Sequence, residues 1–188
     1  MTKDIILDAA MTILDDYGLG DLTIRRLTKH LGTAAGAMYW HFPSKQALLG
    51  AVADRIMEPL ESFTTSGDWH TDALAFTNQL HSCLTAHRDG ADVVSAALAT
   101  NTATVRPEQL LADILGGLPG DTSAAEAAEI LVFFVLGSTV EEQTAVELAI
   151  TSGSTPDETD AGVEKRKLGA ARVRTGTELI LTGIKASS

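Results

Sequence analysis

The chain has 188 residues, 45% of them apolar, and a formal net charge of −11. This composition suits a globular protein of one or two domains and excludes a chain that is disordered throughout. No apolar run reaches about 18 residues and the first residues lack a secretory signal pattern, so we expect a cytoplasmic protein with no membrane span. The single cysteine, Cys83, excludes an internal disulfide framework and a cysteine-based zinc site.

The charge is distributed unevenly along the chain. Residues 1–50 are neutral overall, whereas residues 51–188 carry nine basic and twenty acidic side chains. Residues 22–53 contain no acidic side chain and hold four cations, Arg25, Arg26, Lys29 and Lys45. A local basic stretch in an acidic protein predicts a local partner that carries phosphate.

Two short helices are predicted at the start of the chain. Residues 3–17 place apolar side chains at the spacing of an amphipathic helix, and Gly18 provides a stop signal. Thr23 is then a good N-cap for a second helix, which Gly32 ends.

Two further helices follow directly. A third is expected from about Thr33 to Trp40, because Phe42 precedes a proline and is therefore disfavoured in a helix. Ser44 is a good N-cap for a fourth helix over residues 44–58, which Pro59 should kink or end.

The polar residues 62–71 form a candidate boundary between this small N-terminal head and a larger body. Within the body, residues 116–120 contain a clear helix breaker. Residues 151–162 have no large apolar side chain, which predicts an exposed, mobile loop. No segment shows the alternation of a strand, so the fold is expected to be all-α. The predicted body helices are residues 71–88, 90–101, 107–117, 123–150 and 165–186.

The second helix, the tight turn at residues 31–33 and the third helix form the pattern of a helix-turn-helix. In that motif the third helix enters the major groove of DNA, and the start of the second lies near a phosphate. Hydrogen-bond donors occur at those places, and small residues let the third helix approach closely. The predicted DNA-binding residues are Thr23, Arg25, Arg26, Thr33, Ala34, Ala35, Gly36, Tyr39, Trp40, His41 and Lys45.

Each of these residues also has an ordinary structural interpretation. Arg25 and Arg26 could be solvated charges on a helix surface. For Trp40 a core position is favoured, because bulky aromatic side chains are mostly buried. The helical pattern together with the acid-free basic stretch is more specific than any single residue.

The most specific motif is Tyr-x-His-Phe-x-x-Lys-x-x-Leu, which begins at Tyr39 and directly follows the helix-turn-helix. With residues 22–27 and 31–32, it makes residues 5–57 resemble the DNA-binding head of the TetR family of repressors. Patches of resemblance continue in the body at residues 87–91, 106–107, 136–137, 141–143 and 178–180. The resemblance implies an all-α fold with a helix-turn-helix domain at 1–45, a linking helix at 44–58, and a ligand-binding and dimerisation domain at 46–188.

The resemblance also implies roles for residues of the head. Tyr39, His41 and Lys45 would hold phosphates, Thr23 would add backbone contacts, and Arg25 could reach a base. The third helix departs from the family pattern, because residues 33–37 offer almost no hydrogen-bonding side chain. Base reading would then depend on Arg25, on the hydroxyl at position 33, and on contacts of alanines with thymine methyl groups.

Some members of the family bind a drug with a magnesium ion that is held through histidines. Our alignment places Val94 and Phe133 at those histidine positions, and only Glu141 matches a nearby acid. Valine and phenylalanine cannot ligate magnesium, so we expect no metal and no other cofactor. The apolar side chains of the body could line an effector cavity or simply form the core. The candidate pocket residues are Met57, Phe76, Leu80, Leu84, Val94, Leu98, Leu111, Phe133, Phe134 and Glu141.

The sequence therefore predicts a dimeric, ligand-responsive transcriptional regulator, in the simplest case a repressor that a small apolar molecule releases from DNA. It would bind a palindromic double-stranded operator and dimerise through the helices at 123–150 and 165–186. A helical binding or scaffold protein without effector control is the alternative. A small helical enzyme is least favoured, because the sequence lacks nucleophile, metal and phosphate-loop motifs; we therefore expect that the chain is not an enzyme.

Overall fold

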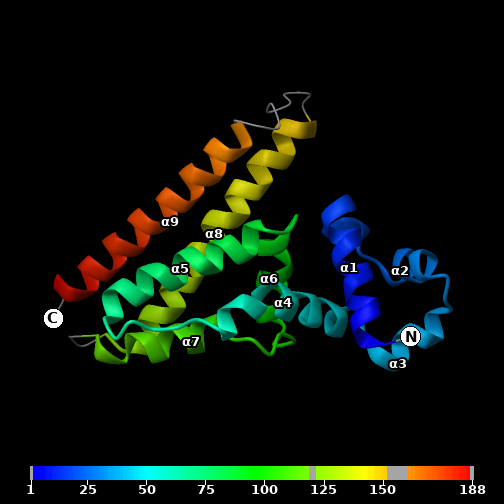
Figure 1. The fold of residues 1–188 in the computed structure, drawn as a ribbon, viewed down its shortest axis with the longest axis horizontal. Coiled ribbons are helices and arrows are strands. Elements are labelled where there is room, and N and C mark those ends of the chain that lie inside the picture. The colour runs from blue at the N-terminus through cyan, green and yellow to red at the C-terminus, as the bar shows by residue number, and fades with distance from the viewer. Residues whose placement is uncertain (1, 119–121, 152–160, 187–188) are drawn as a thin grey trace. The chain divides into compact units, whose positions relative to one another are not determined.

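A computed structural model describes residues 2–118, 122–151 and 161–186, which contain helices and no strand. Figure 1 shows the helices in chain order. They are α1 (Lys3–Tyr17), α2 (Ile24–Leu31), α3 (Ala35–His41), α4 (Lys45–Glu61), α5 (Trp69–Thr85), α6 (Gly90–Ala99), α7 (Pro107–Ile114), α8 (Ala124–Thr151) and α9 (Ala161–Ala186), with the 3-10 helices η1 (Leu19–Asp21) and η2 (Leu115–Gly117).

The prediction of an all-α fold is confirmed, and the helix ends differ from their predicted positions by a few residues. One difference concerns Pro59, which was expected to kink or end its helix; it lies inside α4 and does not end it. Proline lacks the N–H that a helix needs, and this disfavours its place in α4. The next residue, Leu60, is fully buried, and its packing favours continuation of the helix. The side-chain amide of Gln79 also donates to the Pro59 carbonyl at 2.8 Å. Most of the predicted loop, residues 152–160, lies outside the described residues.

Packing divides the chain into two compact units whose limits differ from the candidate boundary at residues 62–71. The head unit comprises Met1–Glu58 and Cys83–Val105, and the body unit comprises Pro59–Ser82 and Arg106–Ser188. The head unit therefore takes in all of α6, which the sequence pattern assigned to the body. The predicted functional division after residue 45 stays a prediction.

The head unit is built on the buried faces of its short helices. Leu14 of α1, Leu27 of α2 and Met38 of α3 are all fully buried. The loop after α6 reaches α4, where Gly50 lies so close to the carbonyl oxygen of Thr102 that a Cβ there would collide with it.

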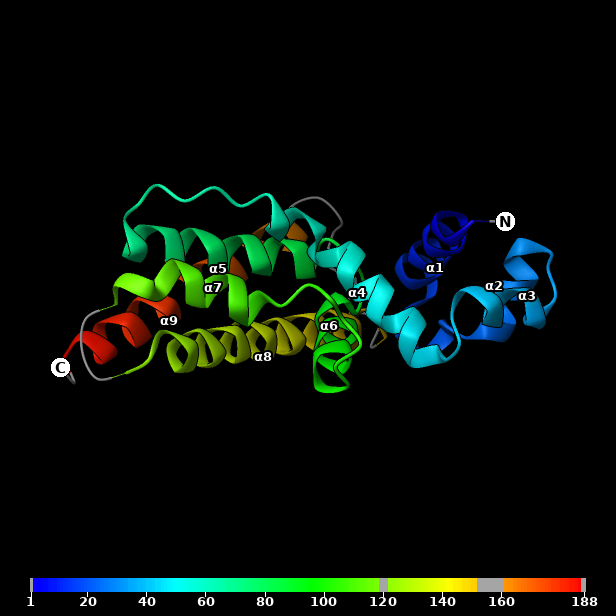
Figure 2. The same ribbon diagram turned by 90° about the horizontal axis from the view of Figure 1, so that it is seen from below.

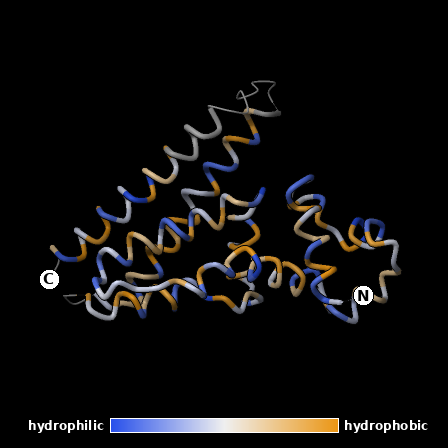
Figure 3. Tube along the Cα trace, in the orientation of Figure 1, coloured by the Kyte–Doolittle hydropathy of each residue, from blue (hydrophilic) through white to orange (hydrophobic). Residues whose placement is uncertain are grey.

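In the body unit, α8 packs beside α7 and α9, as Figure 2 shows. Hydrophobic residues recur between hydrophilic ones along α9 (Figure 3). Two glycines bring α9 close to α8: Gly176 faces the ring of Phe134, and Gly169 faces the carboxylate of Glu142. Within the residues that the structure describes, no helix combines the length and apolarity that crossing a bilayer requires.

Candidate DNA-binding interface

The α2–α3 segment has the geometry of a helix-turn-helix. The Thr23 hydroxyl caps α2 by accepting the Arg26 N–H at 3.1 Å. Gly32 ends α2 in the left-handed region with a φ of 61°, and Thr33 N–H donates to the Thr28 carbonyl at 3.0 Å. This pattern closes a helix with a tight turn. With Thr33 held in the turn, α3 begins two residues later than predicted, at Ala35.

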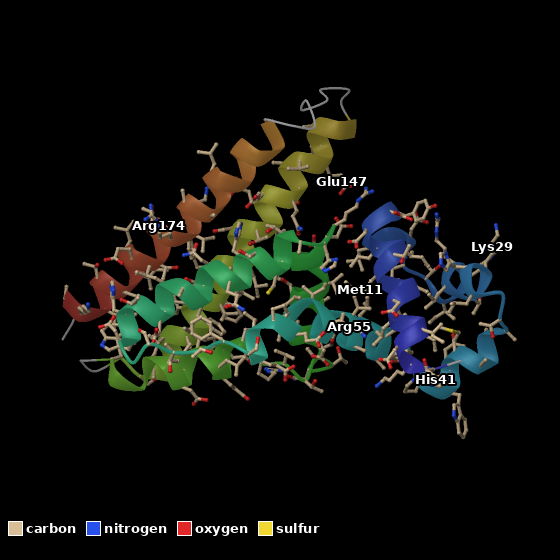
Figure 4. The ribbon with its side chains drawn as sticks, in the orientation of Figure 1. Met11, Lys29, His41, Arg55, Glu147 and Arg174 are labelled. Atoms are coloured by element: carbon tan, nitrogen blue, oxygen red, sulfur yellow. The ribbon has the colours of Figure 1, made fainter. Side chains whose placement is uncertain are left out.

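The predicted DNA-binding residues fall into two groups. Those exposed are Arg25, Ala34, Ala35, Gly36, Tyr39, Trp40 and Lys45, and those partly buried are Thr23, Arg26, Thr33 and His41. Figure 4 labels Lys29 and His41 on the helices of the acid-free stretch. The outer surface of α3 is therefore lined by small side chains and two aromatic ones.

The prediction of a core position for Trp40 is wrong, because its side chain is 87% exposed. Met38 takes the inward position on α3 and is fully buried. Two residues advance a helix by about 200°, so Trp40 lies on the opposite side from Met38. The side of α3 on which residue 40 falls therefore decides its exposure, and it outweighs the general preference of tryptophan for burial.

Arg25 and Arg26 are neighbours in sequence but differ in their surroundings. The Arg26 guanidinium donates to the carboxylate of Asp21 at 2.7 Å and lies 3.7 Å from the centre of the Tyr17 ring. Arg26 thus braces α2 against η1 and the end of α1. Arg25 is exposed, so its charge faces solvent at the start of α2.

The start of α4 completes the positive surface. The Ser44 hydroxyl accepts the Ala47 N–H at 3.0 Å, as the predicted N-cap requires. This cap places Lys45 exposed in the first turn of α4. Phe42 is buried just before it and anchors the end of α3.

The predicted pocket residues are divided between the two units, and their role as a pocket stays a prediction. Met57, Leu84 and Val94 are fully buried in the head unit, and Phe76, Leu80 and Leu111 in the body unit, while Leu98 and Phe134 are partly buried.

Two of the predicted pocket residues are exposed in the single chain. Phe133 is 63% exposed, and Glu141 pairs on the surface with Arg172 at 2.8 Å. For Phe133, the sequence pattern alone could not separate inner from outer apolar positions of α8.

The structure also brings together a pair that the sequence analysis missed. His81 Nε2 lies 2.8 Å from the carboxylate of Glu142, and the two side chains are only 4% and 13% exposed. The two residues are 61 positions apart, so their spacing carries no signal. Within the described residues, no group of histidine, cysteine and acidic side chains could hold a metal ion.

Comparison with known proteins assigns the chain to a family. Residues 6–52 match the bacterial regulatory proteins of the tetR family, and residues 63–187 match the tetracyclin repressor-like C-terminal domain. The chain belongs to the tetR family, and it is a DNA-binding transcriptional regulator. This confirms the family resemblance and the helix-turn-helix head that the sequence predicted.

Individual relatives support the same assignment. The class A tetracycline repressor from transposon 1721 of Escherichia coli is 30% identical over 154 residues, covering 76% of this chain and 69% of the relative. The crystal structure of BioQ from Mycobacterium smegmatis has a TM-score of 0.82 and 33% identity, with full coverage of both chains. A structure of BioQ with its double-stranded DNA operator has a TM-score of 0.77 and 31% identity, covering 99% of each chain.

Proposed function

We propose that this regulator is a repressor that binds a palindromic operator as a homodimer and leaves it when a small apolar molecule binds the body. The observation that carries the proposal is that Arg25, Tyr39 and Lys45, which belong to the acid-free stretch of residues 22–53, are all exposed. Arg25 and Lys45 provide cations on the helices before and after α3, and Tyr39 provides a hydroxyl on α3 itself. Such hydrogen-bond donors suit the phosphates that flank a groove of DNA. The rest of the chain is acidic, which limits non-specific binding to DNA.

Exposed apolar residues on the last two helices support a homodimer. Phe133 and Leu148 of α8 are 63% and 65% exposed, and Leu179 of α9 is 69% exposed. Two such helices from each subunit can form a four-helix bundle around a two-fold axis. The two heads would then bind half-sites about 34–36 Å apart, one turn of DNA.

The interior of the body unit supports an apolar effector. Phe76, Leu80 and Leu111 are buried hydrophobic residues on α5 and α7. Val94 of the head unit and Phe133 of α8 stand where the resemblance would require metal-binding histidines, so a magnesium-bound drug is disfavoured. An effector can release the protein from DNA only by binding the free state more tightly than the DNA-bound state.

Fluorescence anisotropy with the DNA flanking its own gene, measured across a salt series, tests the proposal. We expect tight binding to one palindrome, with an affinity that falls steeply with salt, since each phosphate contact contributes about −0.9 to the slope of log affinity against log salt. A screen of small apolar molecules for release of the bound DNA would then test effector control. Weak binding without sequence preference would instead favour the scaffold alternative.

A further inference from the structure

The first turn of α1 lies against the end of the helix-turn-helix. The Nζ of Lys3 lies 5.3 Å from the centre of the Phe42 ring, a distance at which a cation is attracted to the face of an aromatic ring. Phe42 directly follows His41, the last residue of α3, and is itself buried. The contact therefore keeps the Lys3 ammonium beside residues 39–45, which supply most of the predicted phosphate contacts.

The cap of α1 fixes the position of this lysine. The Thr2 hydroxyl accepts the Ile5 N–H at 3.4 Å, which makes Lys3 the first residue of the helix. Lys3 is exposed. Its ammonium is thus held at one place on the head unit and can still reach a partner in solution.

The acidic side chains of α1 do not cancel the charge of Lys3. Asp4 and Asp8 instead pair with Arg55 of α4, at 3.6 and 3.2 Å. Consecutive residues of a helix point about 100° apart, so Asp4 turns toward Arg55 while Lys3 turns toward Phe42. Within the residues that the structure describes, no acidic side chain forms an ion pair with Lys3.

We propose that Lys3 is a further DNA-binding residue, which holds a backbone phosphate of the operator; this inference rests on the DNA contacts of the proposed function. Lys3 lies outside the acid-free stretch of residues 22–53, so the charge pattern of the sequence gave no sign of it. A phosphate is the same in every sequence, so Lys3 adds affinity without sequence preference. The interface then includes the start of α1 as well as α2, α3 and the start of α4.

Two substitutions separate the charge of Lys3 from its packing on Phe42. Lys3→Met keeps a long apolar side chain and removes the charge, whereas Lys3→Arg keeps the charge. Anisotropy titrations of an operator duplex across a salt series compare them with wild type. For the dimer, Lys3→Met should make the slope of log affinity against log salt less steep by about 1.8, because each subunit loses one contact worth about 0.9. Lys3→Arg should keep the wild-type slope.

Operators with one neutral phosphate locate the contact. In each duplex, a methylphosphonate replaces a single phosphate of the half-site and removes its charge. At one position, this replacement should weaken the binding of wild-type protein and leave the binding of Lys3→Met unchanged. Such a result would show that the lysine and that phosphate act as a pair.

Arg174→Met is the matched control, because it removes an exposed cation from α9 and should keep the wild-type slope. The proposal is overturned if Lys3→Met has the wild-type slope, or if every methylphosphonate weakens Lys3→Met as much as wild type. An equal loss of affinity in Lys3→Arg also overturns it, since only the packing on Phe42 would then matter. A wild-type protein that prefers no palindrome would instead contradict the proposed function, and the slopes on a non-specific duplex would still decide the role of Lys3.

Discussion

The exposed side chains of the candidate DNA-binding interface differ in what they can recognise. Tyr39 and Lys45 suit phosphates, which are the same in every sequence, whereas the Arg25 guanidinium can pair with a base edge. We expect Tyr39→Ala and Lys45→Ala to weaken binding to all operators by similar factors. Arg25→Ala should change the preference among operators, by about 1–3 kcal/mol at the base it contacts. Anisotropy titrations with a set of operator variants measure both effects.

The control for these variants is Arg174→Ala, which removes a cation from α9 and should leave operator affinity unchanged. An even loss of affinity for every operator in Arg25→Ala would contradict its role at a base. Arg26→Ala should instead lower the stability of the head, because Arg26 is held by Asp21 and Tyr17.

The stability of the fold should depend on pH through one identifiable carboxylate, that of Asp72. It is buried and accepts hydrogen bonds from Ser66 N–H at 2.9 Å, the Ser66 hydroxyl at 2.7 Å and Gly67 N–H at 3.1 Å. The Ser66 bonds foremost hold the pKa of Asp72 below its ordinary value of 3.8, although burial opposes them. A carboxylate with a lowered pKa stabilises the fold above its unfolded-state pKa, and this stability is lost as the pH falls through the folded-state value.

We therefore expect the free energy of unfolding to decrease as the pH falls below about 4. Asp72→Asn should be less stable than wild type at neutral pH and should lose less stability on acidification. Urea unfolding of both proteins at a series of pH values measures this difference. If the two curves of stability against pH run parallel, Asp72 is not the source of the dependence.

At the scale of elements, the packing of α8 against α9 depends on a glycine of α9, which has no side chain. A Cβ at Gly176 would overlap the ring of Phe134, whereas a Cβ at Gly183 would have no neighbour within 4 Å. Gly176→Ala should destabilise the protein by about 1–3 kcal/mol through overpacking. Gly183→Ala on the same helix should be neutral or stabilising by up to about 1 kcal/mol, since alanine favours a helix.

Thermal and urea unfolding of the two alanine variants provide the comparison. Equal effects would show that helix propensity alone governs both positions and that the contact with Phe134 has no energetic weight. A double variant that also carries Phe134→Leu should recover part of the stability that Gly176→Ala loses, because the smaller side chain leaves room for the added methyl group.

At the scale of the whole molecule, the outward apolar residues of α8 and α9 predict the oligomeric state. We expect wild-type protein to have twice the 19.8 kDa mass of one chain in solution. Phe133→Glu should give single chains, because it places a charge in the proposed interface. Light scattering after gel filtration measures the mass. Ile5→Glu, at a 50% exposed position of α1, should remain dimeric, and a Phe133→Glu dimer would contradict the proposed interface.

The positions of the helices and the family of the protein could be predicted because their signals are local. Each signal comes from residues that are close in sequence. Examples are the apolar spacing of α1, the Thr23 and Ser44 caps, and the motif that starts at Tyr39. A local signal does not show which side of a helix meets a neighbour. For that reason Trp40 was expected in the core, although its side chain is exposed.

By itself, the sequence determined the helical class, the basic stretch of residues 22–53 in an acidic chain and the membership of a repressor family. Only the tertiary structure decided that Trp40 faces solvent, that Arg26 serves as a brace and that Asp54 holds Thr104, which is 50 residues away. The physical reason is that caps and apolar spacing act within one helix. Contacts between distant residues depend instead on how whole helices rotate and pack against one another.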